Sequence, residues 1–258
     1  MHSASPVTDG TAPMNSIKAY LGRGALAGMA GGSSAALFQW LVTESQIRKA
    51  LALEAAHEVG VHQEMFSRTT QVVWGMFAAC LYGTFLGLMF AILCAAIWRY
   101  LPGRTMFARA MQTGLVVFAT WSLIPALKYP ANPPSVGNPD TISMRTTAYL
   151  LLIAVSIVVS LLAWMLWREV TARGFGGANR FVVVGSLYVA AITTAYLIFP
   201  SSPDPVDAPA TLIWHFRIDS LAGNALLWLV LATSFGWLGD RALARAGGPV
   251  LARQSSLV

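Results

Sequence analysis

The chain has 258 residues, of which 56% are hydrophobic and only 11% are charged. Soluble domains carry about 25% charged residues, so the composition excludes an ordinary soluble domain and indicates a polytopic helical membrane protein. The net charge of +6 is no sign of nucleic-acid binding here, because basic residues gather on the cytoplasmic loops of membrane proteins.

Six stretches are long and apolar enough to cross a bilayer, which takes about 20 residues each. They are 19–43, 72–98, 108–127, 146–167, 181–199 and 220–238. The sixth is the weakest candidate, because it carries polar residues such as Asn224. The pattern predicts an all-α membrane bundle of about six transmembrane helices in one domain, 17–240. A disordered tail at 1–16 and a flexible tail at 241–258 would flank it.

Glycines recur every fourth residue in the first two spans, at Gly24, Gly28 and Gly32 and again at Gly83 and Gly87. Glycines with this spacing line one face of a helix and allow a second helix to approach closely. We expect tight helix packing there, either within the chain or with a partner helix. For the pair in the second span, the alternative that small residues are simply common in membrane helices stays open.

Basic residues are unevenly divided between the two sides that six spans define. Eleven Lys and Arg fall on the side of the N-terminus and six on the other side. The positive-inside rule therefore predicts a multi-pass inner-membrane protein with both termini in the cytoplasm. Eight of the 11 acidic residues fall outside. A mildly acidic outer face suits an arriving cation, although outer loops that simply lack basic residues would show the same balance.

The segment between the first two spans carries Glu54, His57, Glu58 and His62. Good helix formers fill 44–59, so the first span is expected to continue outward as a helix, and spacings of three and four place side chains on one helical face. Imidazole together with carboxylate suits a divalent transition metal. We predict these four as metal ligands, with a solvated helix surface as the alternative.

A polar but stiff loop follows the third span at 128–145. Its four prolines fix φ and remove backbone donors, whereas a flexible linker would be rich in Gly and Ser. We predict that this loop shapes the mouth of the bundle, with Asp140 as a further metal ligand. The residues assigned to this entrance loop are Lys128, Tyr129, Pro130, Asn132, Pro133, Pro134 and Arg145.

The stretch before the sixth span alternates polar and apolar residues and includes Trp214, His215, Arg217 and Asp219. We predict His215 as a metal ligand. The alternative is an interfacial anchor, because aromatic residues favour the membrane interface, with Arg217 and Asp219 paired to each other.

No Asp, Glu, Lys, Arg or His lies in the interior of the second to sixth spans. The sequence also lacks a phosphate-binding loop, a nucleophile elbow and a Cys-x-x-Cys motif, so we expect neither an enzyme nor a bound cofactor. Cys80 and Cys94 are expected to be buried and unpaired. The polar residues that could line a path are Gln39, Gln112, Thr120, Thr193, Thr194 and Asn224.

Three segments together resemble one known family: KYPANPPSVGNPDTISMRTT at 128–147, APATLIWHFRIDSL at 208–221, and RGALAG at the start of the first span. They are similar to the CbtA family, predicted cobalt transporter subunits of prokaryotes, over about 17–240. The resemblance implies Co²⁺ as cargo and a small His-bearing membrane partner, CbtB. The matched positions are Lys128, Tyr129, Pro130, Asn132, Pro133, Pro134, Asp140, Thr141, Arg145, Pro209, Ala210, Thr211, Leu212, Trp214, Phe216 and Arg217.

The chain departs from the family pattern in three respects. Many family members look rich in His between the first two spans, where this chain has only His57 and His62. His215 replaces what is more usually an arginine. The family is often described with five spans, whereas we count six.

We expect uptake of a divalent metal ion, which the resemblance implies is Co²⁺, by a protein in contact with membrane lipid and a CbtB-like partner. One alternative is a non-transporting scaffold that assembles with a partner through its glycine faces. Another is a membrane enzyme or carrier for a small organic molecule, which the uncharged spans would permit.

Overall fold

The computed structural model describes residues 17–57, 66–134, 136–201 and 208–254. Within these ranges the chain is helical and contains no strand, and six helices are long and apolar enough to cross a membrane. This confirms the predicted all-α membrane architecture. The elements are α1 (Ile17–Phe38), η1 (Gln39–Thr43), α2 (Glu44–His57), α3 (Arg68–Ile97), η2 (Trp98–Tyr100), α4 (Met106–Val117), η3 (Phe118–Leu123), α5 (Ile124–Lys128), η4 (Pro139–Thr141), α6 (Ile142–Ala172), α7 (Gly177–Ile198) and α8 (Ala210–Gln254).

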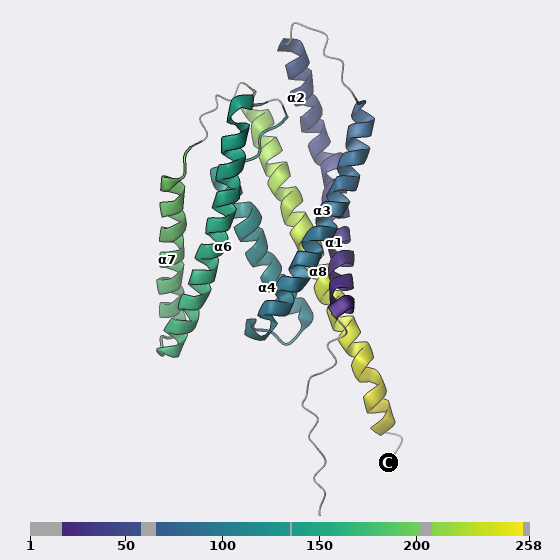
Figure 1. The fold of residues 1–258 in the computed structure, drawn as a ribbon, viewed down its shortest axis with the longest axis vertical. Helices are drawn as coiled ribbons and strands as arrows, with labels where there is room; N and C mark the ends of the chain where they lie inside the picture. The colour runs from purple at the N-terminus through teal and green to yellow at the C-terminus, as the bar shows by residue number, and fades with distance from the viewer. Residues whose placement is uncertain (1–16, 58–65, 135, 202–207, 255–258) are drawn as a thin grey trace, which may run out of the picture.

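The first crossing continues without a break from α1 through η1 into α2, as the helix-forming residues after the first span predicted. Figure 1 shows that α1 begins at the same end of the bundle where α8 finishes, while α2 lies at the opposite end. We call the end with α2 the outer end and the other the inner end, after the orientation that the basic residues predict. That orientation relative to the cell stays a prediction.

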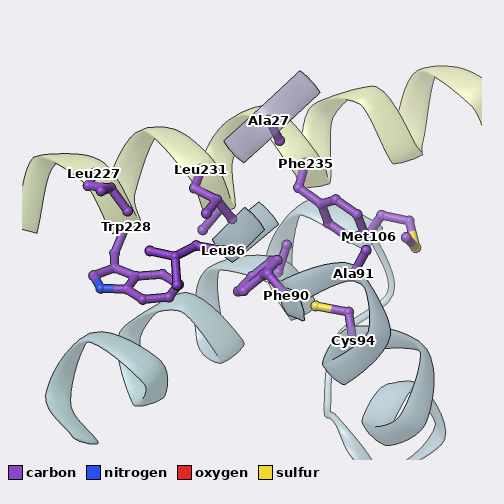
Figure 2. Packing of buried hydrophobic residues seen from close by; sticks show 12 residues of the cluster. Ala27, Leu86, Phe90, Ala91, Cys94, Met106, Leu227, Trp228, Leu231 and Phe235 are labelled. Atoms are coloured by element: carbon purple, nitrogen blue, oxygen red, sulfur yellow. The ribbon is translucent and has the colours of Figure 1, made fainter. Parts of the chain in front are cut away.

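Helix α8 lies at the centre of the bundle, against α1 and α4. Leu231 and Phe235 of α8 are almost completely buried, and the ring of Phe235 meets that of Phe90 edge to face at 5.5 Å. Figure 2 shows these residues packed with Trp228 and Cys94. The span that was the weakest candidate because of its polar residues therefore packs against several other crossings, where polar side chains can find protein partners instead of lipid.

The glycine faces of the first two spans meet each other within the chain. Gly28 of α1 lies directly against Gly83 and Gly87 of α3, and Gly24 faces Gly87 in the same way. The predicted close packing is confirmed and is intramolecular. A partner helix could not use the same face without separating α1 from α3, so a scaffold would have to bind its partner through another surface.

Asp240 joins α8 to the start of α4 at the inner end. Its Oδ1 accepts a hydrogen bond from the backbone N–H of Met106 at 2.7 Å, and its Oδ2 accepts one from Phe107 at 3.2 Å. A carboxylate at a helix N-terminus satisfies N–H groups that the helix itself leaves unbonded. Helix α8 also continues to Gln254, into the stretch predicted as a flexible tail, whereas 1–16 lies outside the described residues.

Helices α6 and α7 form a hairpin at the side of the bundle (Figure 1). The Ser160 and Tyr188 hydroxyls are 3.1 Å apart between the two helices. Ser156 of α6 donates to the Thr120 carbonyl of η3 at 2.6 Å, which attaches the hairpin to the third crossing. Most of the apolar side chains of α7 remain exposed, which suits a helix that faces lipid.

Candidate functional site

The stiff loop after α5 is bonded to the end of α7. The Lys128 ammonium donates to the Tyr196 carbonyl at 2.8 Å, and the Tyr129 hydroxyl donates to the Pro200 carbonyl at 2.6 Å. A cation is favourable beside the last carbonyls of a helix. Desolvation raises the pKa of Tyr129, so this phenol remains a neutral donor at physiological pH.

The same loop is bonded to α8 through Arg217, whose Nη2 donates to Oδ1 of Asn132 at 2.9 Å. Asn132 and Arg217 belong to the two sequence segments that are far apart in the chain yet share the family resemblance. Since Arg217 bonds Asn132, the alternative in which it pairs with Asp219 is wrong: within the described residues, Asp219 forms no hydrogen bond or ion pair.

Two crossings contain a turn of π-helix, η1 in the first and η3 in the third, and both contact α8. A π-turn inserts an extra residue into the helical ladder and often marks a functional site. At η1 the backbone N–H of Glu44 bonds to the Gln39 carbonyl, five residues back. The two π-turns therefore alter the helix surface at two places that face the same central helix.

A cavity of about 300 Å³ lies between η1, α3 and α8. Its polar lining comes from Gln39 and Thr43 on the first crossing, Tyr82 on α3, and Asp219 and Asn224 on α8. Asn224 is exposed in the middle of a membrane-crossing helix and donates to the Ser220 carbonyl at 3.0 Å. Polar groups at this depth need protein or water partners, and the Oδ1 of Asn224 has one in the Ser122 hydroxyl of η3, at 3.4 Å.

A second cavity, of about 250 Å³, lies closer to the outer end. Glu44 is buried there and accepts hydrogen bonds from Arg68 Nη2 at 2.6 Å and Arg48 Nε at 3.1 Å. Gln39 lines both cavities, and Pro134 of the stiff loop lines the outer one. The two cavities therefore lie beside the same stretch of the first crossing, one lined by the 128–145 loop and the other by Asp219.

A family model described as probable cobalt transporter subunit, CbtA, matches residues 17–240. The chain belongs to the CbtA family. It is thus a multi-pass membrane protein of a transporter-subunit family, and a subunit implies partners. Neither a curated protein nor a solved structure matches the chain.

The ligands predicted for this CbtA protein do not form a group in the part that the structure describes. Glu54 is half-buried on α2, and Asp140 and His215 are exposed. His57 is the last residue of α2, and Glu58 and His62 lie outside the described residues. Across the described ranges, no three His, Cys, Asp or Glu side chains are placed to hold a metal together. The six ligands stay predictions.

Of the polar residues expected to line a path, Gln39 and Asn224 lie on the inner cavity of this CbtA chain. Gln112 instead donates to the Pro102 carbonyl at 3.0 Å, and Thr193 and Thr194 are exposed on the peripheral α7. Sequence reasoning missed Asp219 and Glu44 as path residues. Both lie at the edge of an apolar span, where a carboxylate is normally explained by the solvent-exposed interface.

Proposed function

We propose that this CbtA protein takes up a divalent cation, Co²⁺ by its family, from the outer side along the two cavities that share Gln39. The observation that carries the proposal is the carboxylate of Asp219, which has no partner among the described residues and lines a polar cavity among membrane-crossing helices. A charged side chain within a membrane bundle is costly unless it faces water or a partner, and it is a mark of an ion pathway.

The lining suits a cation that keeps part of its water. Carboxylate, amide and hydroxyl oxygens are suitable ligands for hydrated divalent ions. One water occupies about 30 Å³ of liquid, so about 300 Å³ admits an ion with several waters. A single carboxylate would hold the ion weakly, and weak binding allows the ion to leave again.

Selectivity for cobalt requires ligands softer than these oxygens, and imidazole is the natural choice. The predicted ligands His57, His62 and His215 would supply it at the outer end, together with the CbtB-like His-bearing partner. In this proposal the protein resides in the inner membrane, carries no cofactor and catalyses no reaction.

Flux into proteoliposomes that contain only this protein tests the proposal. A metal-sensitive dye inside reports Co²⁺, with Mg²⁺ as comparison and an imposed membrane potential. We expect Co²⁺ uptake above that of protein-free liposomes, or uptake that begins when the small partner protein is added. Liposomes that stay impermeable to Co²⁺ with both proteins present would contradict a transport role.

A further inference from the structure

Two arginines at the inner end stack on the same tyrosine. The guanidinium carbon of Arg99 lies 4.7 Å from the centroid of the Tyr100 ring, and that of Arg168 lies 5.4 Å from it. Arg168 also lies 5.2 Å from the Trp164 ring, which meets the Tyr100 ring edge to face at 5.3 Å. These four residues, which we call the arginine–aromatic cluster, connect η2 to the inner half of α6.

No carboxylate neutralises this cluster in the part of the chain that the structure describes. The acidic residues of the inner end there are Glu169 and Asp240. Glu169 accepts a hydrogen bond from Arg173 Nε at 2.9 Å, and Asp240 accepts hydrogen bonds from two backbone N–H groups of α4. Arg99 and Arg168 are both exposed and form no hydrogen bond or ion pair in the described ranges.

The surface of α6 beside the cluster is apolar and faces lipid. Leu161, Leu162 and Met165 are each more than half exposed, within one turn of Trp164. Tyr and Trp rings favour the level of the lipid headgroups. The cluster therefore combines two guanidinium groups that have no acidic partner among the described residues with aromatic rings that favour the headgroup level and an adjacent exposed apolar strip.

We propose that the arginine–aromatic cluster binds the phosphate of an anionic phospholipid whose acyl chains lie along the apolar strip of α6. Guanidinium groups bind phosphate oxygens through paired N–H donors. Basic pockets between membrane helices on the cytoplasmic side bind such headgroups. The acyl chains distinguish this ligand from a free phosphate ion, which has nothing to place against the strip.

Binding to the purified full chain in detergent micelles tests this proposal, with phosphatidylglycerol and phosphatidylcholine as probes and native mass spectrometry as the readout. The test variant is Arg99→Gln/Arg168→Gln. The matched control is Arg241→Gln/Arg245→Gln, which removes two positive charges from the same end of the bundle. It also removes a cation–π contact, because the guanidinium carbon of Arg241 lies 3.7 Å from the centroid of the Trp237 ring. All these arginines are exposed, so the folds should survive, which circular dichroism checks.

We expect phosphatidylglycerol to bind the wild type and the control alike, and the cluster variant about tenfold more weakly. Phosphatidylcholine should bind all three equally weakly. Equal losses in both variants would mean that only net charge attracts the lipid, and an unaffected cluster variant would mean that the site lies elsewhere. Either result overturns the proposal, as does displacement of the lipid by millimolar inorganic phosphate.

Discussion

Gly28→Ala should prevent α1 and α3 from packing and leave little folded protein. A Cβ at this position would lie directly against the Gly83 carbonyl oxygen and 2.7 Å from the Gly87 Cα. Both are backbone atoms, so relief requires separating the two helices. Overpacking in a core lowers the free energy of unfolding by about 1–3 kcal/mol where side chains can adjust. Because backbone cannot adjust in this way, we expect Gly28→Ala to lose at least about 3 kcal/mol. The melting temperature and the yield of monodisperse protein in detergent measure the effect.

Gly22→Ala is the matched control for this substitution. Gly22 lies on the same helix, and a Cβ added there would meet no atom within 4 Å. The exchange is chemically identical, and alanine has the higher helix propensity. The control should therefore fold and melt like the wild type. If Gly28→Ala melted at the same temperature as Gly22→Ala, the close contact between α1 and α3 would be wrong.

Asp219→Asn should reduce Co²⁺ flux by at least about tenfold. Asparagine keeps the shape of the side chain and removes the one charge that the described residues bring to the inner cavity. A hydrogen bond or contact to a charged group is worth about 1.5–3 kcal/mol, and 1.4 kcal/mol corresponds to a factor of ten. Initial rates of dye response in proteoliposomes, at equal amounts of inserted protein, measure the effect.

Two further variants show whether a loss of flux is specific to the carboxylate of Asp219. Glu169→Gln removes a carboxylate that is exposed at the inner end and paired with Arg173, and it should leave the flux unchanged. Asp140→Ala tests the predicted ligand in the outer loop. Full uptake by Asp140→Ala would exclude Asp140 as a ligand, whereas full uptake by Asp219→Asn would exclude the cavity as the path.

The sequence predicted the six crossings and the glycine contact because both are repeated, local patterns. The sixth span was its weakest candidate because of polar residues such as Asn224, and a sequence alone cannot tell a polar residue that faces lipid from one that bonds to a neighbouring helix. In the structure Asn224 accepts a hydrogen bond from Ser122 of the third crossing and donates one to the Ser220 carbonyl of its own helix. The glycines were found because close packing of two helix backbones favours glycine at every fourth position.

The site was less predictable than the fold. Proline content indicated a shaped loop at 128–145, but its partners Tyr196 and Arg217 lie far along the chain. The π-turns depend on how whole helices pack and have no sequence signal that we recognised. In the sequence, Arg217 stands two residues before Asp219 and offered a simple ion-pair partner for it. The structure shows that Arg217 bonds Asn132 instead.

Cobalt protection of a cysteine in the inner cavity tests the proposed path most directly. Ser220 lines the cavity, and Ser201 is exposed outside it. The two variants to compare are Ser220→Cys and Ser201→Cys, each in a chain whose Cys80 and Cys94 are replaced by alanine. We predict that Co²⁺ slows thiosulfonate labelling of Ser220→Cys, that it leaves Ser201→Cys unaffected, and that adding Asp219→Asn removes the protection. An unchanged labelling rate at Ser220→Cys, in vesicles that still take up Co²⁺, would contradict a path through this cavity.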